Sequence, residues 1–137
     1  MVKWGFGDSI ATGRIGYLMR LLPVDRKNYY IRFAESASKQ SKLRFRVGCV
    51  LYHKGNIIST GYNKMRSVRS ITKRFVKFPG SIHAEVDAII NAKRELNGCV
   101  AIVIRLDRMG NLALAKPCKE CLNYLEYVGI RTVYYSE

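Results

Sequence analysis

The chain has 137 residues, of which 48% are hydrophobic, and it carries 24 basic against 10 acidic side chains, a formal net charge of +14. This length and apolar content predict one folded domain and exclude a largely disordered chain. No stretch approaches the roughly 18 apolar residues of a membrane span, so we expect a protein that does not bind membranes. Four cysteines without a secretory signal argue against a disulfide framework, so we expect a cytoplasmic protein.

Residues 1–24 are predicted to form an N-terminal arm or extra element, and residues 25–137 the domain proper. The arm would contain a short helix that stops before Pro23. Its apolar side would consist of Ile15, Tyr17, Leu18, Leu21 and Leu22. Asp25 is then a candidate N-cap, and apolar residues recur at helical spacing to about Ser38, which predicts the first helix of the domain.

Two strands are predicted next, in residues 45–52 and 57–61, because both segments are dense in β-branched and apolar side chains. The residues between them include Lys54-Gly55-Asn56, a turn sequence. We therefore expect the two strands to form a hairpin.

The connection at residues 62–81 is basic, contains aromatic residues and has no clear period. Cations mixed with aromatic rings suit nucleic-acid phosphates and stacked bases. The cations are Lys64, Arg66, Arg69, Lys73, Arg74 and Lys77. We predict substrate contacts here, with Tyr62, Arg66 and Lys73 as candidates; the alternative is a solvated loop without a partner.

The second half of the chain alternates helices and strands. The predicted elements are a helix at 82–96 closed by Asn97-Gly98, a buried strand at 99–106, a short extended segment at 112–115, a helix at 118–128 and a strand at 132–135. The order α-β-β-α-β-α-β predicts an α/β fold with three layers, α-β-α, around a mixed central sheet. Ligand sites of such folds lie where helices begin at strand ends.

Two short motifs in this half carry the chemistry, His83-Ala84-Glu85 and Pro117-Cys118-Lys119-Glu120-Cys121. The thiolates of Cys118 and Cys121, three residues apart at a helix start, can face one ion, and helix N-termini favour thiolates. With the imidazole of His83 they would fill three corners of a tetrahedral Zn²⁺ site and leave the fourth for a water molecule, whose pKa the ion lowers toward ~7. We therefore predict one zinc ion per chain.

Glu85 is two residues from His83, so it points in another direction and can face a substrate. Hydrolysis by a metal-activated water requires several proton transfers, and one carboxylate beside the metal can make all of them. A redox-active Cys-x-x-Cys pair and a structural zinc knuckle are the alternatives, but a knuckle needs a fourth ligand and His53 is the only other histidine. Cys49 and Cys99 lie in apolar stretches and are predicted to be core residues.

These motifs resemble those of the zinc-dependent cytidine deaminase superfamily, and more narrowly its cytidylate and deoxycytidylate deaminases, including small phage and viral members. The resemblance covers about residues 27–136. It rests on residues 47–50 and 58–63, residues 83–89, and residues 116–121 with 129–134.

The resemblance implies that His83, Cys118 and Cys121 bind zinc and that Glu85 is the proton shuttle. It further implies that Asn63 hydrogen-bonds the sugar or base of the substrate. Backbone amides near Ala84 and Cys118 would hold the reacting groups. Lys116 stands where the family usually has Ser or Glu, which places a cation beside the site. Because family members are often oligomeric, we expect a homo-oligomer, in the host cytoplasm if the protein is viral.

Three functions remain open. The first is deamination of a free cytosine nucleotide such as dCMP. The second is deamination of cytosine or adenosine within single-stranded DNA or RNA, which the net charge of +14 and the basic connection favour. The third is a zinc-stabilised nucleic-acid-binding module without activity, for which Glu85 would have no use. We favour the free nucleotide, because motif resemblance is closer evidence than charge.

Overall fold

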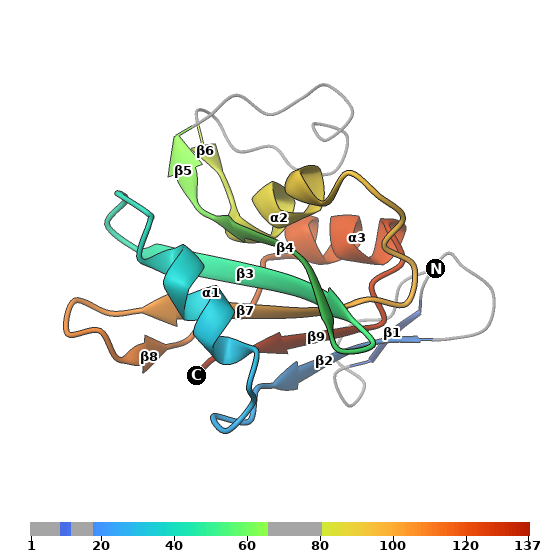
Figure 1. Ribbon diagram of the computed structural model, residues 1–137, viewed down its shortest axis with the longest axis horizontal. Helices are drawn as coiled ribbons and strands as arrows, with labels where there is room; N and C mark the ends of the chain where they lie inside the picture. The colour runs from blue at the N-terminus through green and yellow to red at the C-terminus, as the bar shows by residue number, and fades with distance from the viewer. Residues whose placement is uncertain (1–8, 12–17, 66–80) are drawn as a thin grey trace.

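The computed structural model describes residues 9–11, 18–65 and 81–137 (Figure 1). The helices in these ranges are α1 (Ile31–Ser38), α2 (Ala84–Ala92) and α3 (Lys119–Tyr127). The strands are β1 (Ser9–Ala11), β2 (Leu18–Pro23), β3 (Arg46–His53), β4 (Asn56–Tyr62), β5 (Lys64–Met65), β6 (Ser81–Ile82), β7 (Val100–Leu106), β8 (Leu112–Ala113) and β9 (Thr132–Tyr135). Among the described residues, no helix combines the length and the hydrophobicity that crossing a membrane requires.

The main sheet is mixed, as predicted, and has the strand order β1-β2-β9-β7-β3-β4, with β8 paired to β7 (Figure 1). Strand β9 runs parallel to both of its neighbours, β2 and β7. Strand β3 runs antiparallel to both of its neighbours, β7 and β4. Strands β5 and β6 form a separate antiparallel pair. The hairpin prediction is confirmed: Lys54 and Gly55 both have positive φ, of 49° and 81°, as a tight turn between β3 and β4 requires.

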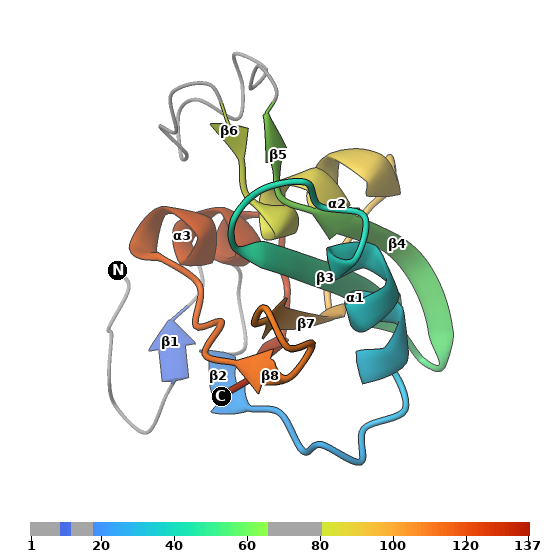
Figure 2. The same cartoon turned by 90° about the vertical axis from the view of Figure 1, so that its left-hand side faces the viewer.

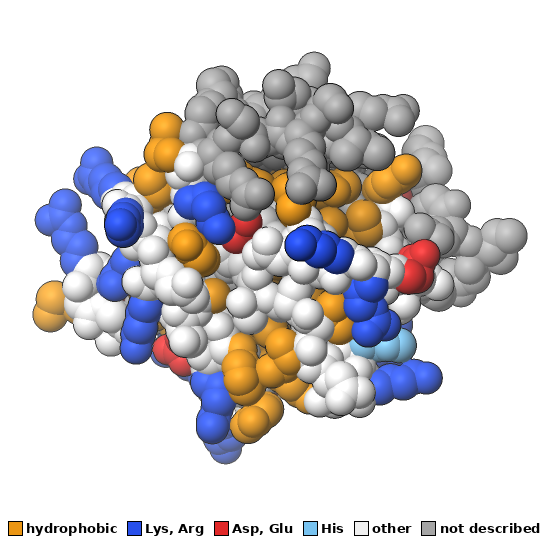
Figure 3. Space-filling model, turned by 45° about the horizontal axis from the view of Figure 1, so that its top comes forward, with side chains coloured by type: hydrophobic (Ala, Val, Ile, Leu, Met, Phe, Trp, Pro, Cys, Tyr) orange, Lys and Arg blue, Asp and Glu red, His pale blue; other side chains and the backbone are white. Residues whose placement is uncertain are grey.

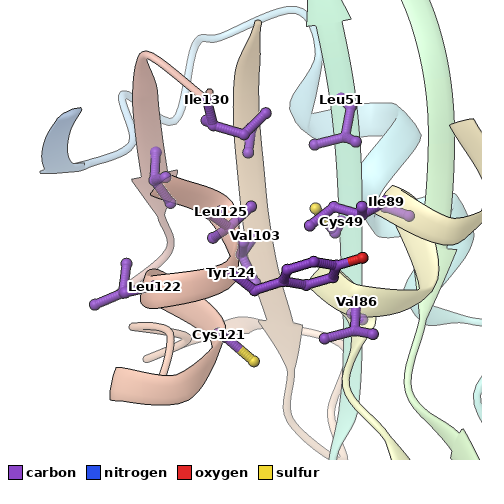
Figure 4. Packing of buried hydrophobic residues seen from close by; sticks show 14 of the residues in the cluster. Cys49, Leu51, Val86, Ile89, Val103, Cys121, Leu122, Tyr124, Leu125 and Ile130 are labelled. Carbon is purple, nitrogen blue, oxygen red and sulfur yellow. The ribbon is translucent and has the colours of Figure 1, made fainter. Parts of the chain in front are cut away.

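Strand β7 lies between β9 and β3, and most of its side chains are buried, because helices cover both faces of the sheet. On one face, Ile31 and Ala34 of α1 pack in a cluster with Val50, Ile102 and Ile104. On the other face, α2 and α3 contribute to a larger cluster that includes Cys49, Leu51 and Val103 of the sheet (Figure 4). The three-layer α-β-α prediction is confirmed.

Two glycines let the helices lie directly on the sheet. A Cβ at Gly48 in β3 would clash with the carbonyl oxygen of Ala34 and lie 2.6 Å from the backbone nitrogen of Ser38, both in α1. A Cβ at Gly61 in β4 would clash with the backbone nitrogen of Ala88 and lie 2.6 Å from the carbonyl oxygen of Ala84, both in α2. The position of α2, which carries part of the site described below, therefore depends on Gly61.

The helix predicted before Pro23 is wrong, because residues 18–23 form strand β2 in the main sheet. Arg20 and Leu21 pair with Thr132 and Val133 of β9 in parallel register. Met19 and Leu21 are buried while Arg20 between them is exposed, the alternation of a strand rather than of a helix.

Two helix boundaries also differ from the prediction. Asp25 does not cap α1: its Oδ1 accepts a hydrogen bond from the Lys27 nitrogen at 2.9 Å within a turn, and the helix begins only at Ile31. Helix α2 ends at Ala92 rather than near residue 96, because Lys93 adopts the left-handed conformation with φ of 52°.

Candidate metal centre and active site

The cluster at the centre of the candidate site begins with two helix N-termini. His83 and Cys118 are the N-cap residues of α2 and α3, both with extended backbone (ψ of 157° and 167°). Cys121 lies one turn into α3 and is buried. The positive ends of the two helix dipoles thus face the ligand atoms and favour anionic sulfur.

The spacing of the three ligand atoms matches a zinc site. Nδ1 of His83 lies 3.8 Å from Sγ of Cys118 and 3.4 Å from Sγ of Cys121, and the three ligand atoms lie within 4.8 Å of one another. Tetrahedral zinc with bonds of about 2.3 Å to sulfur and about 2.0 Å to nitrogen requires N···S separations of about 3.5 Å. One nitrogen and two sulfurs are also a donor set that zinc prefers, so the residues fit Zn²⁺ as the cofactor.

The electrostatics of the cluster favour a bound cation. Hydrogen bonds with Cys121 and His83 lower the pKa of Cys118 to about 5, although burial opposes this change. The hydrogen bond with Cys118, together with burial, raises the pKa of Cys121. Burial alone would lower the pKa of His83, but the hydrogen bond with Cys118 and the charge of Glu85 raise it overall. Two sulfurs and a carboxylate lie close together here. A bound dication would offset the repulsion between their negative charges.

Glu85 lies in the first turn of α2 with 4% of its surface exposed. Burial raises its pKa, and its backbone hydrogen bond and His83 oppose part of this change. Cys49 is fully buried, and burial followed by the charges of Glu85 and Asp87 raises the pKa of its thiol. Cys49 thus lies in the core under the site, and Glu85 is the acidic residue that faces the cavity described next.

A cavity of about 320 Å³ opens beside the cluster. Six of the predicted site residues line it: Asn63, His83, Ala84, Glu85, Lys116 and Cys118. The remaining walls are Phe45, Val47, Val103, Arg105, Leu114, Ala115 and Pro117. A mostly apolar cavity of this size with a few convergent polar groups is the ordinary form of a small-molecule site.

Asn63 has a structural task at the cavity wall. Its Oδ1 accepts a hydrogen bond from the Val47 nitrogen at 2.9 Å, and its Nδ2 donates to the carbonyl oxygen of Phe45. The amide therefore joins the end of β4 to the start of β3. Counting only bonds to described residues, one Nδ2 hydrogen and one Oδ1 lone pair are left for a ligand.

The other predicted contacts have different locations. Tyr62 does not line the described cavity; its nitrogen donates to Oδ2 of Asp87 at 3.1 Å, and its ring lies 4.0 Å from the Nζ of Lys64. Lys116 is exposed at the rim, with Nζ 5.9 Å from the centroid of the Tyr135 ring. Arg66 and Lys73 lie outside the described residues.

Sequence reasoning missed Phe45 and Arg105 on the cavity wall, and Asp87, whose carboxylate accepts a hydrogen bond from the Tyr62 nitrogen. The signal for Arg105 was a single cation inside the apolar run of residues 99–106. For Asp87 it was an acid among the apolar residues of α2, where a charge needs a buried partner.

Comparison with protein families and curated proteins gave concordant matches. The sequence model of the family described as "Cytidine and deoxycytidylate deaminase zinc-binding region" matches residues 24–137. A curated protein from Aliivibrio fischeri, described as an uncharacterized deaminase in the luxG 3' region, is 30% identical over 95 residues. That match takes in 66% of this chain and 58% of the relative, so this chain spans little more than half of that protein.

Solved structures show the same fold. The dCMP deaminase of cyanophage S-TIM5, in its apo form and in complex with dCMP and dUMP, matches with a TM-score of 0.57 at 23% identity, over 77% of this chain and 78% and 76% of the two phage chains. A diaminohydroxyphosphoribosylaminopyrimidine deaminase/5-amino-6-(5-phosphoribosylamino)uracil reductase of Thermotoga maritima matches with a TM-score of 0.51 at 22% identity, over 77% of this chain and 28% of that one.

Proposed function

Because the chain belongs to the cytidine and deoxycytidylate deaminase family, we propose that it removes the amino group from the base of a cytosine nucleotide by hydrolysis, with dCMP as the favoured substrate. Water and the cytosine base would give uracil and ammonia. The observation that carries this proposal is the buried Glu85 carboxylate in a cavity whose wall also contains His83 and Cys118.

The metal would be held by His83, Cys118 and Cys121, one ion per chain. When bound, zinc lowers the pKa of a water molecule toward ~7 and so supplies a nucleophile at neutral pH. The donor spacing described above supports this ligand set.

Glu85 would move the protons. Its carboxylate accepts a proton from the attacking water and gives it to the ring nitrogen of cytosine. It then accepts the second proton from the hydroxyl now bonded to the base carbon and gives it to the amine, which leaves as ammonia while the carbonyl of uracil forms. Its raised pKa suits a group that both accepts and donates near neutral pH. The first backbone N–H groups of α2 and α3, near Ala84 and Cys118, would stabilise the oxygen at the reacting carbon.

Two features support a nucleotide as the substrate. The cyanophage protein of the same fold is a dCMP deaminase, solved with dCMP and dUMP. Asn63 at the cavity wall has hydrogen-bonding capacity left for a sugar hydroxyl or base. The alternative is cytosine or adenosine within a single strand, which the net charge of +14 favours.

One assay panel tests both. The zinc-loaded protein is incubated with dCMP, CMP, cytidine, single-stranded DNA and tRNA, and ammonia release and base conversion are measured. We expect turnover of dCMP above that of cytidine. Conversion of DNA or tRNA alone would show that the substrate is a polymer and not a free nucleotide. No conversion of any of the five substrates would overturn the proposed reaction.

We also propose that the protein is a homo-oligomer. The sheet ends in the edge strands β1 and β4, at which another chain can pair or pack. Light scattering after size-exclusion chromatography tests this, and a monomer mass across a hundredfold concentration range would contradict it.

A further inference from the structure

Beside the active-site cavity, positive side chains surround an exposed aromatic ring. Phe45 is 54% exposed, and its ring centroid lies 5.4 Å from the guanidinium carbon of Arg44 and 5.3 Å from that of Arg105. These residues come from the segment before β3 and from β7, which face the viewer in Figure 2. Figure 3 shows Lys and Arg side chains gathered at the left end of the molecule, where Figure 1 places that segment and the β7–β8 turn.

A second cavity of about 210 Å³ lies at this cluster. It is lined by Arg44, Phe45, Arg105, Leu106, Asp107 and Arg108. Phe45 and Arg105 also line the active-site cavity, so the two cavities share a wall. A ligand whose base enters the first cavity can therefore extend over Phe45 and Arg105 into the second.

The second cavity has a net positive lining. Its lining contains three guanidiniums and one carboxylate, that of Asp107. Oδ1 of Asp107 accepts hydrogen bonds from the nitrogens of Met109 at 2.8 Å and Asn111 at 2.9 Å, which engages it in closing the β7–β8 turn. One oxygen of the carboxylate is thus engaged in the turn, and the three arginines outnumber this single negative charge in the lining.

Arg105 is held in place before any ligand binds. Its Nε donates to the carbonyl oxygen of Leu114 at 3.0 Å, and its backbone nitrogen donates to Oγ of Ser136 at 3.1 Å. Within the described part of the chain, no hydrogen bond engages its two terminal nitrogens. A planar guanidinium fixed at Nε presents these nitrogens as a fork suited to two oxygens of one phosphate.

We propose that Arg105, with Arg44 and Arg108, forms a subsite for the phosphate of the nucleotide whose base enters the active-site cavity, and that Phe45 packs against its sugar. This inference rests on the proposed function and names the group that would distinguish a nucleotide from a nucleoside. The phosphate is either the terminal phosphate of a mononucleotide or an internucleotide phosphate of a single strand.

The test is calorimetric binding to the zinc-loaded protein of ligands that already carry uracil and so cannot be deaminated. The ligands are dUMP, deoxyuridine and a short single-stranded oligodeoxynucleotide with one uracil. The variants are R105Q and the double variant R44Q/R108Q. The double variant tests the subsite even if R105Q does not fold, because Arg44 and Arg108 are exposed and their side chains make no described hydrogen bond. R94Q removes an exposed arginine at the end of α2 and is the matched control.

Removing hydrogen bonds to a charged phosphate should lower affinity about 10-fold to 100-fold. We expect this loss for dUMP in both variants, with deoxyuridine binding unchanged and R94Q like the wild type. A loss confined to the oligonucleotide would support the same subsite for an internucleotide phosphate. Unchanged affinity for both phosphate ligands, or an equal loss for deoxyuridine, would overturn it.

This measurement needs no turnover, so the two proposals fail separately. A protein that deaminates no substrate yet loses dUMP affinity in R105Q would refute the reaction and retain the subsite. A protein that deaminates dCMP while both variants bind dUMP like the wild type would refute the subsite alone.

Discussion

Nζ of Lys64 lies 3.0 Å from Oδ2 of Asp87, a carboxylate with no exposed surface. The same oxygen accepts the hydrogen bond from the Tyr62 nitrogen. Asp87 lies in α2, one turn after His83, whose carbonyl oxygen accepts a hydrogen bond from the Asp87 nitrogen at 3.0 Å. This ion pair therefore joins β5 to the helix that carries His83 and Glu85.

Replacing Asp87 by Asn should destabilise the protein, because it removes the negative charge that pairs with Lys64. The side chain of Lys64 is only 25% exposed, so water compensates for this loss only in part. We expect a loss of about 2–3 kcal/mol in the free energy of unfolding, below the range for fully buried pairs because water reaches the lysine. Urea denaturation measures it. D25N, at an exposed turn, is the control and should change stability by less than about 0.5 kcal/mol; equal midpoints for the two variants would contradict a role for the ion pair.

Replacing Gly61 by Ala should displace α2, because the new Cβ would clash with the backbone of Ala88 and Ala84. A backbone contact cannot yield as a side chain does, so we expect a loss of about 3 kcal/mol in unfolding free energy and weaker zinc binding. G110A is the control, since Gly110 has φ of 83° but nothing within 4 Å of its Cβ position. It should lose only about 1 kcal/mol, from the backbone conformation, and keep its zinc. Similar losses in both variants would show that the contact with α2 does not matter.

Replacing Glu85 by Gln should leave zinc bound and remove turnover. The amide has nearly the shape of the carboxylate but cannot accept the proton from water, so kcat should fall by about 10²–10⁴-fold. Metal analysis and steady-state kinetics with dCMP are measured on the same sample. E35Q changes a half-buried glutamate on α1, across the sheet, and should retain full activity. Substantial activity in E85Q would refute the proton-shuttle role.

Replacing Cys118 by Ser should lower zinc affinity by roughly 10²-fold or more, because the hydroxyl does not ionise as the thiol does. Zinc is counted after dialysis against a weak chelator. C99S is the control, since Cys99 is buried, directly precedes β7 and lies outside the cluster. It should keep one zinc ion per chain even if its stability falls. Unchanged stoichiometry in C118S would rule out ligation by this residue.

Several features of the protein follow from the sequence itself. From α1 onward, the helices and the strands of the main sheet appear in the predicted order because hydrophobic periodicity is a local property, and β7 is central because a strand that is apolar at nearly every position must be buried on both faces. The cluster of His83, Cys118 and Cys121 was predictable from chemistry, since few functions combine an imidazole and two closely spaced thiols with an adjacent carboxylate.

Only the tertiary structure decided the rest, because those features depend on contacts between distant segments. Strand β2 reads locally as a helix, and it is a strand because it pairs with β9 at the other end of the chain. The Lys64–Asp87 ion pair and the arginines around Phe45 join residues from separate elements, and no local pattern encodes such proximity. The sequence thus determined which ligand atoms gather at the site, while the packing of β3, β7 and α2 determined which side chains surround its cavity.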